Sequence, residues 1–152
     1  MSLAEAERPE AKPLAIFGEI TYAQMKDNAK LAVVVMKLIK EVCEHSKGRH
    51  TVGQITDGLI TGACSVWGVM RMPADLTAIM VTVPHEGVLD VLLAGPDIKD
   101  LTPFLSRLDG IARSERCAKT RIRGPYFWKP HLPDGWRPVV TVFEKEIDAR
   151  PA

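Results

Sequence analysis

One stretch near the carboxyl end of the chain brings together a thiol, a phenol, an imidazole and several guanidinium groups. Cys117 would act as a nucleophile only if a nearby cation lowered its pKa, and Arg113 or Arg116 could do so. The competing interpretation, a buried apolar cysteine at the start of a strand, is the one we favour. Tyr126 and His131 could exchange a proton with a substrate, but the sequence defines no partner for either.

No metal site is predicted from the residues that usually bind metals. The cysteines Cys43, Cys64 and Cys117 are far apart and never form a C-x-x-C pair, which also argues against a disulfide framework. Three further histidines lie near the ends of predicted elements without ligand spacing: His45, His50 and His85. We therefore expect reduced, mostly buried cysteines and surface histidines.

Charge is segregated along the chain, although the formal net charge is only +1. Residues 107–137 hold eight basic and three acidic side chains, whereas residues 75–106 hold one basic and five acidic side chains. The period of two in a strand places Lys119, Arg121 and Arg123 on one face, as a candidate contact surface. That surface could meet a partner protein, a nucleotide phosphate or DNA, but no interleaved aromatics support specific nucleic-acid binding.

Length and composition are those of one domain with a substantial core, because 46% of the 152 residues are hydrophobic. Residues 1–13 and 149–152 are expected to be tails, with a single domain over residues 14–148. No signal peptide is recognised, and no apolar run approaches the roughly 20 residues that a membrane-spanning helix needs. We expect a protein kept in a reducing compartment.

Hydrophobic periodicity predicts the elements that position these groups. Two T-x-x-Q capping boxes open helices, one over residues 22–45 and one from Thr51 to Gly62. Asp100 or Thr102 could cap a third helix. Strands are predicted over residues 64–70, 76–83, 88–94, 118–123 and 138–143, with a short helix over 126–132 before the last. The fold class is therefore α+β, with a mostly antiparallel sheet flanked by helices.

This order of elements resembles the fold of the GNAT superfamily of N-acetyltransferases. Over residues 48–147 the chain looks like a family of small, mostly uncharacterised phage-encoded proteins with that fold. The matching residues are Trp67, Gly124, Trp128, Leu132, Glu144 and Lys145. The resemblance implies that the strands carrying Asp90 and Arg121 are neighbours. The aromatic residues 126–128 lie beside two prolines, and we expect them to pack beneath the last strand.

In active members of that superfamily, acyl-CoA lies where the fourth and fifth strands separate, and its pyrophosphate binds the glycine-rich start of the next helix. The resemblance therefore makes Gly95, Lys99 and Thr102 the candidate cofactor residues, and Tyr126 and His131 the candidate acids. The loop here contains a single glycine, prolines that lack N–H donors, and Asp97 and Asp100, which would repel a phosphate. The cradle for the cofactor is thus predicted to be degenerate.

Two functions follow from the resemblance and this departure from it. The first is a phage or prophage protein without a cofactor, which binds other protein subunits in a virion or in the bacterial cytoplasm. The alternative is an active N-acyltransferase that uses acetyl-CoA through a divergent pyrophosphate loop.

Overall fold

The computed structural model describes residues 15–46, 49–71, 75–122, 132 and 134–137. The first element is strand β1 (Ala15–Ile20), followed by helices α2 (Tyr22–Asp27), α3 (Ala29–His45) and α4 (Val52–Thr61). Strands β2 (Ser65–Arg71), β3 (Asp75–His85) and β4 (Val88–Pro96) come next. After them come α5 (Ile98–Leu101), the 3₁₀ turn η2 (Thr102–Phe104), α6 (Arg107–Ser114) and β5 (Lys119–Ile122).

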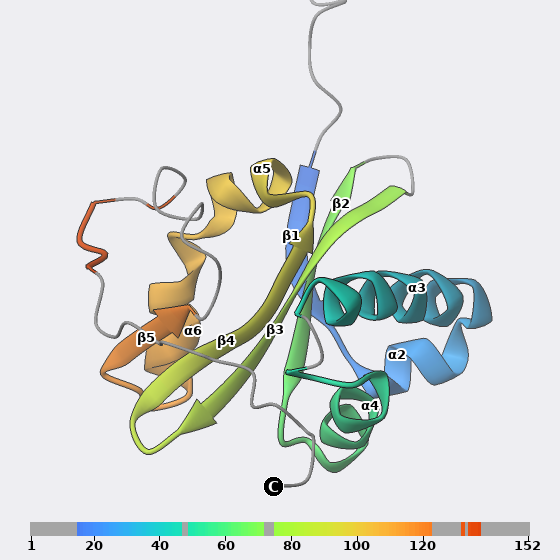
Figure 1. Ribbon diagram of the computed structural model, residues 1–152, viewed down its shortest axis with the longest axis horizontal. Helices are drawn as coiled ribbons and strands as arrows, with labels where there is room; N and C mark the ends of the chain where they lie inside the picture. Colours follow the sequence, from blue (N-terminus) through green and yellow to red (C-terminus); the bar gives the residue numbers. More distant parts are fainter. Residues whose placement is uncertain (1–14, 47–48, 72–74, 123–131, 133, 138–152) are drawn as a thin grey trace, which may run out of the picture.

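The five strands form one sheet in the order β1-β2-β3-β4-β5, so the sheet order follows the chain. The first three pairings are antiparallel, and β4 pairs with β5 in parallel across α6. Helices α3 and α4 cover one face, and α6 covers the other (Figure 1). The α+β class, the mostly antiparallel sheet and its flanking helices are as predicted from the sequence.

Both capping boxes form. Thr21 and Thr51 each accept a hydrogen bond from the backbone N–H three residues on, and the glutamine at that position accepts one through Oε1 from the threonine N–H. The predicted continuous helix over residues 22–45 is wrong, however. It breaks at Asn28, whose Oδ1 accepts a hydrogen bond from the N–H of Leu31 at 3.1 Å and so caps α3. The side-chain cap at Asn28 thus divides the predicted helix into two.

Two further differences concern elements beside the site. Strand β1 was not predicted, although it forms one edge of the sheet within the described residues. The predicted caps Asp100 and Thr102 were wrong, because Asp97 caps the four-residue α5 and the longer α6 begins only at Arg107. The predicted strand 138–143 and all but Leu132 of the predicted helix 126–132 lie outside the described residues.

The packing of α4 against β2 depends on Gly58. A Cβ at this position would lie 2.5 Å from Cys64 Sγ and 3.5 Å from Cys64 Cβ. Because the Cys64 side chain is buried, we expect Gly58→Ala to lower the free energy of unfolding by about 1–3 kcal/mol. Urea denaturation followed by circular dichroism measures this loss.

The matched control is Gly53→Ala in the same helix, where the new Cβ would meet only Thr51 Oγ1, at 4.0 Å. It should leave the protein at least as stable as the wild type. In a Cys64→Ala background the sulfur is gone, so Gly58→Ala should become nearly neutral. An unchanged penalty in that background would show that the Cys64 sulfur is not the cause.

Candidate functional site

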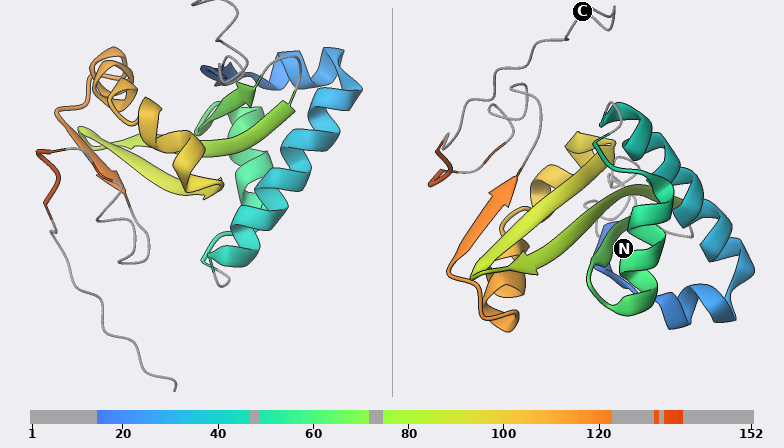
Figure 2. Two further views of the ribbon diagram at one scale, coloured as in Figure 1. Left: turned by 90° about the horizontal axis from the view of Figure 1, so that it is seen from above. Right: turned by 60° about the horizontal axis from the view of Figure 1, so that its bottom comes forward.

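Within the described residues, strands β4 and β5 are paired over only part of the length of β4. Their parallel register runs from Val88 opposite Lys119 to Val91 opposite Ile122, while β4 continues to Pro96. Figure 2 shows the two strands diverging towards their carboxyl ends. Within the described residues, the last part of β4 therefore has no strand beside it on this edge. We call this gap the β4–β5 wedge.

A β-bulge lies in β4 where the wedge begins. Val81 on β3 pairs with Leu93 and Thr82 pairs with Val91, so Leu92 has no register partner on β3. Among the described residues it has none on β5 either, because that register ends at Val91. A bulge disrupts the ladder and leaves backbone groups of its extra residue unpaired. Leu92 is thus the extra residue of the bulge and lies at the start of the wedge.

The predicted cofactor residues lie at the end of β4 and in the short helical turns that follow it. Gly95 has a φ of +140°, which only glycine adopts easily, and Lys99 is exposed. Asp97 Oδ1 accepts hydrogen bonds from the backbone N–H groups of Lys99 at 3.1 Å and Asp100 at 3.3 Å. Thr102 donates its hydroxyl to the Ile98 carbonyl oxygen at 2.9 Å. The loop's own side chains thus already occupy two of the N–H groups that a phosphate would need.

Asp100 does not add free negative charge to this loop. Its carboxylate is buried and forms a two-pronged ion pair with Arg71 at the end of β2, including an Arg71 Nε to Asp100 Oδ2 distance of 3.1 Å. Hydrogen bonds from Arg71, and then from Thr77, hold the pKa of Asp100 below its usual value despite burial. The expected repulsion of a phosphate by Asp100 is therefore largely neutralised, and Asp97 is the remaining anion.

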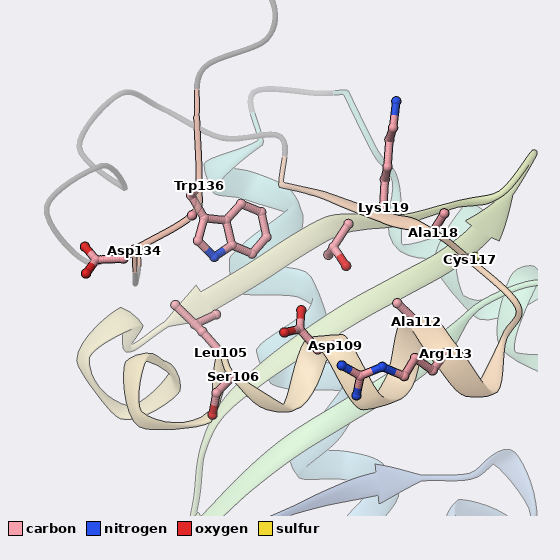
Figure 3. A pocket seen from close by; sticks show the side chains of 12 residues that line it. Leu105, Ser106, Asp109, Ala112, Arg113, Cys117, Ala118, Lys119, Asp134 and Trp136 are labelled. Carbon is pink, nitrogen blue, oxygen red and sulfur yellow. The ribbon is translucent and has the colours of Figure 1, made fainter.

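A cavity of about 430 Å³ lies between α6 and the start of β5. Figure 3 shows Asp109 pointing into it from α6, with Trp136 across the opening and Lys119 pointing away. Arg113 and Cys117 line the same cavity, as the nucleophile hypothesis for Cys117 requires. The Cys117 side chain is buried, however, with its sulfur 3.6 Å from the Glu115 carbonyl oxygen, as the structural interpretation requires.

The other sequence candidates are distributed as follows. The register places Asp90 directly opposite Arg121, which confirms the predicted neighbouring strands. Lys119 is exposed and Arg121 is half-buried. The candidate contact surface is therefore open to solvent at Lys119 and only partly open at Arg121. Tyr126, His131 and Arg123 lie outside the described residues, and their roles stay predictions.

All three cysteines are buried and free of disulfides. Burial raises the pKa of the Cys43 and Cys64 thiols, which keeps them protonated and unreactive. His85 is exposed and lies 3.7 Å from the exposed Glu86 carboxylate. No cluster of three or more possible metal ligands occurs in the part of the chain that the structure describes. None of the helices in that part is both long and apolar enough to cross a membrane.

Comparison with known proteins gives matches by structure only. No family model and no curated protein sequence matches the chain. Among solved structures, it superposes on a probable acetyltransferase with a TM-score of 0.61 at 9% identity, covering 89% of this chain and 99% of the other. A putative acetyl transferase from Pyrococcus furiosus gives a TM-score of 0.60 at 10% identity, covering 88% and 100%.

The aminoglycoside N-acetyltransferase AAC(6')-Iy, solved in complex with CoA, matches with a TM-score of 0.59 at 8% identity, covering 89% of this chain and 95% of that one. At such identities the likeness establishes the fold and not the activity. The protein therefore has the acetyltransferase fold that the sequence resemblance implied.

Sequence reasoning missed two features of the site. Leu92 carries no special residue type, so nothing in the sequence marks it as a bulge. The Arg71–Asp100 pair joins residues 29 positions apart, and only the packed fold brings them together.

The ion pair predicts a definite pH dependence of stability. Asp100→Asn should be less stable than the wild type at neutral pH, because Arg71 then faces an uncharged partner. The folded-state pKa of Asp100 lies below its unfolded value of about 3.9, so the pair stabilises fully above that pH. The contribution is lost as the pH falls through the folded-state pKa.

Urea denaturation across the acidic range measures this effect. The difference in unfolding free energy between the wild type and Asp100→Asn should shrink as the pH falls below about 4. Asp57→Asn, at an exposed position on α4, is the control and should show no such trend. A difference that stays constant with pH would contradict the assignment of the stability to the Asp100 charge.

Proposed function

We propose that the protein is an acyl-CoA-dependent N-acyltransferase, with acetyl-CoA as the donor. The observation that carries the proposal is the separation of the parallel strands β4 and β5 at the Leu92 bulge. The fold supports it, because the structural neighbours reported above are acetyltransferases and one is a CoA complex. This favours the second of the two functions considered from the sequence.

The backbone of β4 would bind the donor. When bound, acetyl-CoA supplies an acyl group activated as a thioester. Its extended arm carries two amide groups, and residues 92–96 offer a strand edge that can pair with them as a neighbouring strand would. The backbone at the Leu92 bulge would hydrogen-bond to the acyl end and orient it. Tyr126 and His131 stay the predicted candidates for the acid in the reaction.

The pyrophosphate would be bound differently from the glycine-rich pattern. Asp97 already accepts hydrogen bonds from the N–H groups of Lys99 and Asp100, so these donors do not fit an additional phosphate. Lys99 is exposed beside them and can supply a positive charge from its side chain. We infer that side-chain cations, rather than backbone N–H groups, would hold the phosphates.

One observation favours a second function, a non-catalytic protein-binding module. The same Asp97 cap places a carboxylate where a phosphate would lie, and such a loop suits a protein that has lost its cofactor. Partner subunits would then meet the contact surface at Lys119 and Arg121. A link with a phage particle stays a prediction from the sequence resemblance alone.

Thermal unfolding with and without acetyl-CoA separates these functions. Acetyl-CoA at 100 times its Kd should stabilise the protein by about 2.7 kcal/mol, seen as a higher Tm. Leu92→Pro removes the backbone N–H at the bulge and should abolish this shift, whereas Leu92→Ala retains the N–H and should keep it. The absence of any shift at millimolar acetyl-CoA would overturn the enzyme proposal and support the binding module.

The inhibitory role of Asp97 predicts a gain from its neutralisation. Asp97→Asn keeps an oxygen that can cap α5 but removes the negative charge. We expect the Kd for acetyl-CoA to fall about two- to fivefold, the effect of a single charge near a helix end. Isothermal titration calorimetry measures it, with Asp57→Asn on α4 as the charge-matched control. An unchanged Kd would place the bound phosphates away from Asp97.

A further inference from the structure

A row of aromatic rings lies on the α6 side of the sheet, away from the β4–β5 wedge. The Phe17 ring stacks with Trp67 at a centroid distance of 5.8 Å and with Phe104 at 5.3 Å, with interplanar angles of 9° and 12°. Trp67 is fixed by a hydrogen bond from its indole Nε1 to Thr82 Oγ1 at 2.9 Å. The row is therefore held rigidly by three separate elements, β1, β2 and η2.

Helix α6 leaves a cavity of about 290 Å³ beside this row. Its lining includes Arg107, Gly110 and Ser114, which recur at helical spacing and so share one face of α6. Phe17 and Trp67 form the opposite wall. The cavity thus lies between an aromatic surface and a face of α6 that carries one cation, Arg107.

Gly110 lines the cavity and adds no side chain to it. A glycine inside a helix is less stable than alanine by about 0.5–1 kcal/mol, so its presence needs a reason. Its φ is not in the left-handed region, and a Cβ there would meet nothing within 4 Å. Neither backbone conformation nor packing therefore requires glycine, in contrast to Gly58. A ligand that fills the cavity would account for the glycine, because any larger residue would reduce the space for it.

Arg107 supplies the charge at this cavity. Its Cζ lies 5.9 Å from the centroid of the Phe17 ring, and the side chain is exposed. Arg107 forms no ion pair with any carboxylate among the described residues. A guanidinium in this position can bind a carboxylate through two parallel hydrogen bonds. The cavity thus combines ring stacking with recognition of an anion.

We propose that this cavity is a binding site for a small planar aromatic carboxylate. Its ring would lie against Phe17 and Trp67, in the space left by Gly110, and its carboxylate would meet Arg107. The sheet order places β1 and β2 at the opposite end from β5, so the site is separate from the β4–β5 wedge. The proposal is independent of acyl-CoA binding.

Benzoate is the probe, and benzamide is its neutral counterpart of nearly the same shape. In ¹H–¹⁵N NMR spectra of the full chain, benzoate should shift the Trp67 indole resonance saturably, with Trp67→Phe used for assignment. Benzamide and the Arg107→Gln variant should each show binding weaker by about tenfold or more. Arg113→Gln, on the same helix at the other cavity, is the control and should bind benzoate like the wild type.

Gly110→Ala gives the sharpest test, because its two effects have opposite signs. It should raise the Tm of the ligand-free protein by about 1–4 °C, as a better helix former does. The same variant should bind benzoate more weakly, because its methyl group enters the cavity. Unchanged benzoate affinity in Gly110→Ala, equal binding of benzamide, or no saturable shift at millimolar benzoate would each overturn the proposal.

Discussion

Both faces of strand β4 carry buried apolar side chains, and each face has to be covered by a different set of helices. Leu93 belongs to the core beneath α3 and α4, whereas Leu89 and Val91 belong to the core beneath α6. A strand buried on both sides needs a layer of helices above and below it. This requirement brings α6 across the sheet after β4 and makes the next pairing, with β5, parallel. The wedge, the loop at Asp97 and both cavities lie along that crossing.

Much of the fold could be predicted because its signals are local. The two capping boxes fix the starts of α2 and α4 through contacts only three residues apart, and the period of two marks β2, β3 and β4. Asn28 was missed because the apolar spacing continues through it on both sides. The start of the helical segment after β4 was misplaced, because Asp97, Asp100 and Thr102 are all plausible helix caps. Only the burial of Asp100 against Arg71 decides among them.

The position of the candidate site could be predicted from the sequence, but its hydrogen bonds and its strand register could not. The sequence located the loop after the third predicted strand and recognised that it is poor in glycine. It could not show that Asp97 occupies two backbone donors, since that depends on the geometry of a four-residue helix. Nor could it show the bulge at Leu92, which arises from a register shift against β3.

The correspondence between sheet order and chain order has a consequence for how the protein folds. Strands β2, β3 and β4 form a meander of consecutive pairings, whereas β1 and β5 each join it across intervening helices. Contacts between segments close in sequence form soonest, so the meander is expected to assemble first and the two outer strands to dock onto it later. The wedge beside β5 and the aromatic cavity beside β1 are therefore completed by the last strands to arrive. Amide hydrogens there are expected to exchange with solvent sooner than those of β3, so each ligand would tighten the part of the molecule that opens most readily.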